Sequence, residues 1–143
     1  MNEDRIEALK QEAGDLESIV LNPVLICDFE MLANGGFAPL NRFMGKSDYE
    51  NVLHRMRLAD GSVFPVPVTF PVDKEYGIGS RVALRDTYGT LLAVMTIEEQ
   101  YAWDKREYRT ALLGSDDTTH PFVSVIERWG AYNISGPLEV IAL

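Results

Sequence analysis

Cysteine and histidine are scarce in this chain. It has one cysteine, Cys27, among 143 residues, so no disulfide can form within the molecule. The two histidines, His54 and His120, lie far apart in the sequence, and neither belongs to a two-histidine metal motif. We therefore expect no metal site and a fold that needs neither disulfides nor a metal ion.

Positive charge is also in short supply, and long apolar runs are missing. The chain has 13 Lys and Arg residues against 22 Asp and Glu residues, a formal net charge of −9. A surface of that sign repels phosphate backbones and anionic lipids. No apolar stretch approaches the roughly 20 residues of a membrane span, and the amino terminus lacks the basic and apolar regions of a signal peptide. We expect a cytoplasmic protein with neither nucleic acid nor membrane as a partner.

The length and composition are those of an ordinary globular chain. Hydrophobic residues make up 46% and charged residues 24%, close to the averages for soluble domains. A chain of this size can bury about two thirds of the surface that its unfolded form exposes. The sequence therefore predicts one domain over residues 1–143.

Amphipathic spacing and capping residues predict several short helices. Asn22-Pro23 has a capping side chain followed by proline at the first helical position, and Asn34-Gly35-Gly36 can end the same helix. The predicted helices span Glu3–Gln11, the segment between Asn22 and Asn34, Asp48–Met56 with Ser47 as its cap and Met56 on its apolar face, Asp104–Leu113, and Pro121–Arg128.

Alternating apolar residues predict strands between these helices. They span Leu16–Leu21, Val63–Val72, Arg81–Arg85, Leu91–Ile97 and Ala131–Ile141, the last interrupted at Gly136-Pro137. Prolines in the Val63–Val72 segment cannot donate to a ladder, so that strand must lie at an edge or bend. The segment 86–89 is a predicted hairpin loop. The sum is an α+β fold, a small and partly open β-barrel with short peripheral helices.

Local motifs offer no active site. Gly45-Lys46-Ser47 resembles the end of a phosphate-binding loop, but Leu40 stands where that loop needs glycine. There is no G-x-S-x-G serine elbow, and Cys27 is expected in the core. Between Asn34 and Phe43 we expect a structured loop with Phe37, Leu40 and Phe43 packed inward. We predict no catalytic, cofactor-binding or metal-binding residue, and no cofactor.

Ordered sequence blocks resemble a known family over nearly the whole chain. The most specific is Cys27–Leu40, which is similar to the stretch C-D-x-E-x-x-x-N-G-x-F-x-P-L, followed by Phe43-Met44. Further blocks continue in the same order at Met56–Gly61, Pro65–Val68, Ala83–Asp86, His120-Pro121 and Gly136–Ile141. They resemble the amino-terminal domain of ATP sulfurylase (sulfate adenylyltransferase), a PUA-like domain. Arg42 stands where that family usually has glycine, and Ser115 replaces a common threonine.

The resemblance implies a supporting role. In that family catalysis belongs to the following domain, where a Q-x-R-N-P-x-H stretch and a histidine motif hold ATP and sulfate, and this sequence contains neither. The expected function is a noncatalytic domain that supports or assembles with a sulfate adenylyltransferase catalytic domain, in cis or in trans, or self-associates. The chain alone is predicted to be inactive.

Two alternatives belong to other classes. The chain can be a free-standing PUA-like binding module for RNA or a small ligand, whose sign is a basic, aromatic-lined face, or an independent enzyme. If the chain has the supporting role, we expect a partly apolar face near the carboxyl terminus to contact the partner. The alternative is that the aromatic residues of this region fill the core. The candidate interface residues are Arg42, Trp129, Tyr132 and Pro137.

Overall fold

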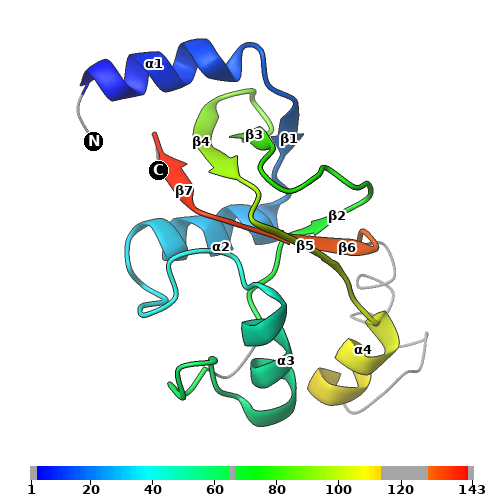
Figure 1. The fold of residues 1–143 in the computed structure, drawn as a ribbon. Coiled ribbons are helices and arrows are strands. Elements are labelled where there is room, and N and C mark those ends of the chain that lie inside the picture. The colour runs from blue at the N-terminus through cyan, green and yellow to red at the C-terminus, as the bar shows by residue number, and fades with distance from the viewer. Residues whose placement is uncertain (1–2, 65–66, 114–128, 142–143) are drawn as a thin grey trace.

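The computed structural model describes residues 3–64, 67–113 and 129–141. In chain order the elements are α1 (Glu3–Ala13), β1 (Ser18–Val20), α2 (Pro23–Ala33), α3 (Lys46–Arg55), β2 (Pro71–Val72), β3 (Arg81–Arg85), β4 (Leu91–Thr96), β5 (Glu99–Ala102), α4 (Lys105–Leu113), β6 (Tyr132–Ser135) and β7 (Leu138–Val140) (Figure 1). The predicted helix at Pro121–Arg128, and with it His120 and Ser115, lies outside the described residues.

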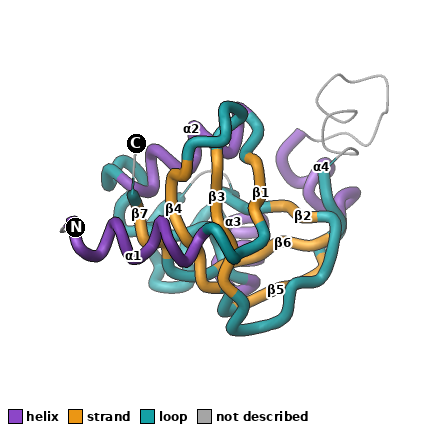
Figure 2. Tube along the Cα trace, turned by 90° about the horizontal axis from the view of Figure 1, so that it is seen from above, coloured by secondary structure: helices purple, strands orange, loops and turns teal. Residues whose placement is uncertain are grey.

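The strands form two open sheets. One has four strands in the order β1-β3-β4-β7, and the other has three in the order β2-β6-β5. Strand β1 pairs in parallel with β3, and the remaining pairs are antiparallel. In Figure 2 the four-stranded sheet lies between α1 on one side and α2 on the other. The predicted α+β class is confirmed, and within the described residues the two sheets do not close into a barrel.

One antiparallel ribbon joins the two sheets. Segment 91–102 carries β4 and then β5, while segment 132–140 carries β6 and then β7, so the same two stretches pair in both sheets. The ribbon bends where Ser135 accepts from the Glu98 N–H (2.8 Å) and Pro137 accepts from the Thr96 N–H (3.2 Å). A Cβ on Gly136 would lie 1.7 Å from the Thr96 carbonyl oxygen. Glycine is therefore required at this bend.

The core divides into two clusters. The larger one gathers large side chains from α2, α3 and both sheets, with Phe29, Phe43 and Phe70 fully buried. The smaller one lies under α1 and consists of Leu9, Ala13, Ala83 and Val94. The four-stranded sheet therefore has its two faces covered in different ways.

Helix starts follow the predicted chemistry at two places. The Asn22 side chain accepts from the Leu25 N–H (2.8 Å) with Pro23 in the first turn of α2. The Asp104 carboxylate accepts from the N–H groups of Arg106 and Glu107 at the start of α4. Both helices were predicted from these capping residues, and both predictions are confirmed.

Helix α3 departs from the prediction at both ends. It begins at Lys46 with Gly45 as its N-cap, so Ser47 is not the cap. The Lys46 N–H donates instead to the Glu99 carboxylate (3.2 Å), which reaches the helix from β5. At the other end Met56 adopts a left-handed conformation (φ 54°) and is 58% exposed, so it does not join the apolar face.

The strand predictions were least accurate where prolines and short strands occur. Of the predicted strand Val63–Val72, the described residues form an isolated bridge between Val63 and Arg57 and the short strand β2, Pro71–Val72, at the edge of its sheet. Strand β5 was not predicted. The predicted strand Ala131–Ile141 is two strands in different sheets, separated at Gly136-Pro137 as expected. The hairpin between β3 and β4 is confirmed, with Gly89 at positive φ.

Candidate functional site

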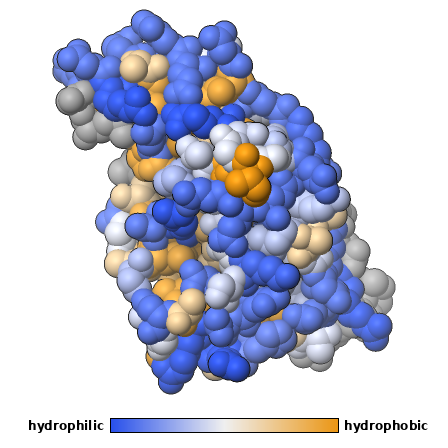
Figure 3. Space-filling view, in the orientation of Figure 1, coloured by the Kyte–Doolittle hydropathy of each residue, from blue (hydrophilic) through white to orange (hydrophobic). Residues whose placement is uncertain are grey.

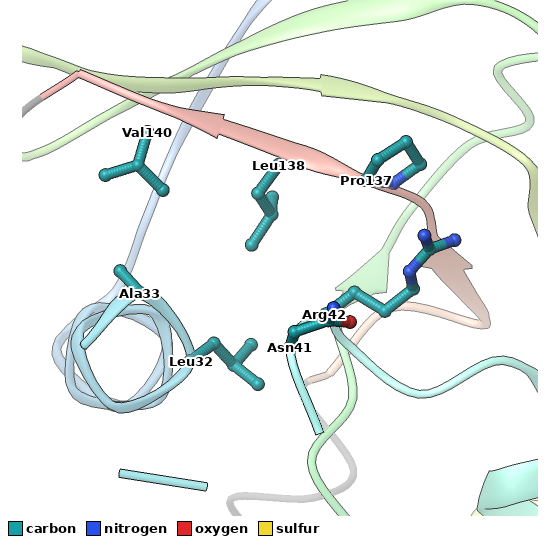
Figure 4. A pocket seen from close by; sticks show the side chains of 7 residues that line it. All are labelled: Leu32, Ala33, Asn41, Arg42, Pro137, Leu138 and Val140. Carbon is teal, nitrogen blue, oxygen red and sulfur yellow. The ribbon is translucent and has the colours of Figure 1, made fainter. Parts of the chain in front are cut away.

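A groove of about 270 Å³ lies between α2 and β7. Figure 4 shows its lining side chains, which come from the end of α2, the segment after it and β7: Leu32, Ala33, Asn41, Arg42, Pro137, Leu138 and Val140. In Figure 3 apolar surface gathers on the same flank of the molecule, below α1. The groove therefore combines apolar side chains from α2 and β7 with polar groups such as those of Asn41 and Arg42, and polar atoms form the larger share of its exposed lining.

Local sequence explains why these segments meet. Helix α2 ends at Ala33, where the chain turns through Gly35 at positive φ (82°). The segment that follows is anchored by Leu40 and Phe43, which are buried, and by Phe37, which is half-buried and meets Phe64 edge to face (5.7 Å). The predicted inward packing is confirmed for Leu40 and Phe43 and is partial for Phe37. This anchoring holds Asn41 and Arg42 opposite β7.

Arg42 carries the charge at the groove. Its Nη1 donates to Glu98 Oε1 (2.5 Å), and the two side chains are 38% and 56% exposed. Glu98 follows β4, so the ion pair links the segment after α2 to the bend of the ribbon. Because Glu98 balances the charge of Arg42, that guanidinium offers little uncompensated positive charge to a small free anion.

The four candidate interface residues fall in two places. Arg42 and Pro137 both line the groove, as Figure 4 shows. Trp129 does not line it: its ring packs against Trp103 (6.0 Å) and Tyr108 (5.7 Å), and it is half-buried on the larger core cluster. Tyr132 is half-buried in β6, opposite Ala102 and Val72. An interface role for these residues stays a prediction.

The sequence prediction missed Leu32, Ala33 and Asn41 as groove residues. Leu32 and Ala33 have no sequence feature that sets them apart from other helix residues. They line the groove because the pairing of β7 with β4 brings β7 opposite them. A usable signal was the glycine turn after α2 followed by the buried Leu40, which predicts that the chain folds back beside its own helix.

Strand β7 is an edge strand. Its pairing with β4 determines which of its backbone groups point toward β4 and which point away from the sheet. The register sets Leu138 opposite Met95, Glu139 opposite Val94 and Val140 opposite Ala93. Toward β4, Pro137 accepts from Thr96, and the Ile141 N–H donates to the Leu92 carbonyl (2.8 Å). Antiparallel pairing alternates, so Glu139 also faces β4, while the N–H and C=O groups of Leu138 and Val140 point away from it.

The amino end of α3 holds one of the chain's own carboxylates. Glu99 accepts from the Lys46 N–H, and a Cβ on Gly45 would lie 2.0 Å from Glu99 Oε2. The Gly45-Lys46-Ser47 motif therefore serves a helix start that is already occupied by an anion. This geometry agrees with the sequence argument against a phosphate loop.

Asp28 and Tyr108, which do not line the groove, have raised pKa values. Burial raises the pKa of Asp28, on α2, to about 6. Burial also raises the pKa of Tyr108, on α4, to about 12, and the Asp28 charge adds to that shift.

The prediction for Cys27 was wrong. Cys27 is exposed and not in the core, because the buried face of α2 is made by Leu25, Phe29 and Leu32. His54 is exposed on α3, and its Nε2 lies 3.0 Å from Glu107 Oε1.

The described ranges contain neither a metal-binding cluster nor a membrane-spanning helix. Within residues 3–64, 67–113 and 129–141, no group of three or more His, Cys, Asp or Glu side chains could hold a metal ion. None of the helices in these ranges is long and apolar enough to cross a membrane.

Comparison with known proteins identifies the family. The model of the PUA-like domain family matches residues 1–143. A sulfate adenylyltransferase of Mycosarcoma maydis is 42% identical over 127 residues, which cover 84% of this chain and 22% of that protein. Those of Schizosaccharomyces pombe and Acaryochloris marina are 38% and 35% identical, and the matches cover 94% and 98% of this chain.

This chain matches only part of each relative: 22% of the M. maydis protein, 29% of the S. pombe protein and 37% of the A. marina protein. Among solved structures, a hexameric APS kinase from Thiobacillus denitrificans has a TM-score of 0.71 at 28% identity, over 99% of this chain and 24% of that one. The chain belongs to the PUA-like domain family, in the form that matches part of sulfate adenylyltransferases.

Proposed function

We propose that this chain is the noncatalytic amino-terminal domain of a sulfate adenylyltransferase, or a stand-alone relative of that domain, and that it forms a single domain over residues 1–143. Such an enzyme makes adenylyl sulfate and diphosphate from ATP and sulfate. This domain supports or assembles with the catalytic part, in cis or in trans. The observation that carries the proposal is 38% identity over 94% of this chain to 29% of a sulfate adenylyltransferase.

The charge of the chain favours a noncatalytic role. Adenylyl transfer to sulfate needs cationic groups around a highly charged transition state. At the groove, the guanidinium of Arg42 is already paired with Glu98, and the net charge of the chain is −9. A partner that carries the catalytic groups fits these properties better than catalysis by this chain alone.

A domain exchange tests the proposal. The matching region of the S. pombe sulfate adenylyltransferase is replaced by this chain, and adenylyl sulfate synthesis is measured with ATP, magnesium, sulfate and pyrophosphatase. We expect the exchanged enzyme to be active, the same enzyme with the region deleted to be inactive, and this chain alone to give no turnover.

Two results contradict the proposal. Turnover by the isolated chain that follows the protein through successive columns would assign catalysis to it. A folded but inactive exchanged enzyme, together with binding of the isolated chain to RNA at physiological salt, favours the free-standing binding module.

A further inference from the structure

The free edge of β7 and the groove beside it together have the properties of a strand-binding site. The N–H and C=O groups of Leu138 and Val140 point away from β4 by the pairing register. The same two residues contribute side chains to the groove, as Figure 4 shows. An extended peptide placed along β7 would therefore meet backbone groups that are not used by β4 and, beside them, the Leu138 and Val140 side chains of the groove.

The two sides of this edge differ in chemistry. On the side toward α2, Leu32, Ala33, Leu138 and Val140 contribute apolar side chains, next to the polar groups of Asn41 and Arg42. On the side toward α1, Glu139 is paired with Arg5 (2.5 Å) and Arg81 (3.0 Å). Because side chains of an added strand alternate between the two sides, the site selects a segment with apolar residues at alternate positions and polar residues between them.

The size of the site identifies the kind of occupant. β7 has three residues, and an edge this short cannot bury the roughly 1,200 Å² of a stable interface between separate proteins. A segment tethered in the same polypeptide or complex has an effective concentration of about millimolar, at which a short strand pairing is sufficient. The S. pombe relative has most of its chain outside the matched region, since this chain covers 29% of it.

We propose that β7 binds, as an added strand, an extended segment from the catalytic part of a sulfate adenylyltransferase, with alternate apolar side chains in the groove. This inference rests on the proposed function, because that function supplies the partner. The backbone of Leu138 and Val140 gives the hydrogen bonds, and Leu32 and Ala33 help to select the apolar residues.

The experiment uses this chain, labelled with ¹⁵N, and overlapping peptides that cover the S. pombe sulfate adenylyltransferase outside the matching region. NMR titration at millimolar peptide follows the amide resonances of β7. We expect a small set of peptides with alternating apolar residues to shift the Leu138 and Val140 amides and to slow their hydrogen exchange about tenfold. The Glu139 amide, already bonded to β4, should change least.

Val140→Pro is the decisive variant. Proline removes the outward N–H while leaving the Glu139 and Ile141 bonds to β4, a position at which edge strands tolerate proline. We expect it to abolish the response, and Val140→Thr, which keeps the N–H and the branched shape, to retain it. If Val140→Pro disturbs the fold, Asn41→Trp fills the groove from an exposed position and leaves the backbone of β7 unchanged.

The outcomes separate this inference from the proposed function. An active domain-exchanged enzyme with no peptide that shifts the Leu138 and Val140 amides overturns the strand-binding site alone. Equal responses of the unchanged chain, Val140→Pro and Asn41→Trp also overturn it. An inactive, folded exchanged enzyme overturns the proposed function, and with it the partner named here.

Discussion

The two faces of the four-stranded sheet are covered by different interactions. On the α2 face, large side chains such as Phe29 and Phe43 are fully buried. On the α1 face the buried cluster is small, and three of its four members are Ala13, Ala83 and Val94. There the charged residues around Arg81 complete the contact.

Arg81 is the centre of the α1 face. Its Nε and Nη2 donate to Glu12 of α1 (2.5 and 2.7 Å), Nη2 also reaches Glu139 of β7 (3.0 Å), and Nη1 donates to Thr96 (2.8 Å). Hydrogen bonds from Arg81 lower the pKa of Glu12, and hydrogen bonds from Arg5 and then Arg81 lower that of Glu139. The α1 face should therefore depend on pH and salt, whereas the α2 face should depend on packing volume.

The largest effect is expected from emptying the α2 face. Phe43→Ala should lower the free energy of unfolding by about 3–5 kcal/mol, because the ring is fully buried and meets Phe70 at 5.0 Å. Phe37→Ala is the matched control, since Phe37 is half-buried, and should cost less. Urea unfolding followed by circular dichroism measures both, and equal losses would contradict the difference in burial.

Removal of the largest apolar side chain of the α1 face comes next. Leu9→Ala should cost about 2 kcal/mol, at the lower end of the range for buried leucine, because small neighbours leave little packing to lose. Amide exchange should show α1 opening while the β3 and β4 amides stay protected. Gln11→Ala, at an exposed position of the same helix, is the control, and loss of β4 protection in Leu9→Ala would show that the two faces unfold together.

Removing the central charge of the α1 face should have a smaller, pH-dependent effect. Arg81→Met should cost about 1 kcal/mol at neutral pH, as expected of a partly exposed ion-pair network. The folded-state pKa values of Glu12 and Glu139 lie below the ordinary 4.5. Their stabilisation is therefore complete above that pH and is lost as the pH falls through the lowered values.

The variant Arg81→Met should lose the part of this acid sensitivity that comes from Glu12, whereas Glu139 keeps its ion pair with Arg5. Thermal melts between pH 3 and 7 measure it, in low and high salt. If the melting temperatures of the two proteins fall equally as the pH is lowered over that range, Arg81 does not stabilise the two carboxylates.

An effect of the opposite sign is expected at Asp28. Burial raises its pKa from 3.8 to about 6, so the folded state binds more protons than the unfolded state in that window and stability falls as the pH rises through it. Asp28→Asn should remove this slope and raise the melting temperature at pH 7. Glu30→Gln, at an exposed position of α2, should change nothing, and a lower melting temperature for Asp28→Asn would contradict the assignment.

Most helices could be predicted because their signals are local. Asn22 and Asp104 cap the helices that follow them through side-chain hydrogen bonds to residues two or three positions away. The start of α3 could not be predicted in this way, since its N–H partner is Glu99, 53 residues further along the chain. Strand β5 was missed for a related reason: its pairing with β6 has no local signal.

The candidate site was predictable only in part. Arg42 stood out as a departure from the family pattern, and Pro137 stood out at an interruption in a predicted strand, and both line the groove. Trp129 was a candidate because the resemblance implies a partly apolar face near the carboxyl terminus, with core packing as the alternative, and its ring packs against Trp103 and Tyr108. Trp129 and Pro137 are close in the sequence, but the ribbon bends between them. The sequence alone does not show this bend.

The sequence by itself determined the family, the α+β class and the helices with local caps, because these depend on residue order and on interactions within a few residues. Tertiary structure decided which strand is left at an edge and which side chains lie opposite it. The bend at Gly136 places Leu138 and Val140 in a different sheet from Ile134. That pairing leaves the backbone groups of Leu138 and Val140 pointing away from β4, a consequence of long-range strand pairing rather than of local residue type.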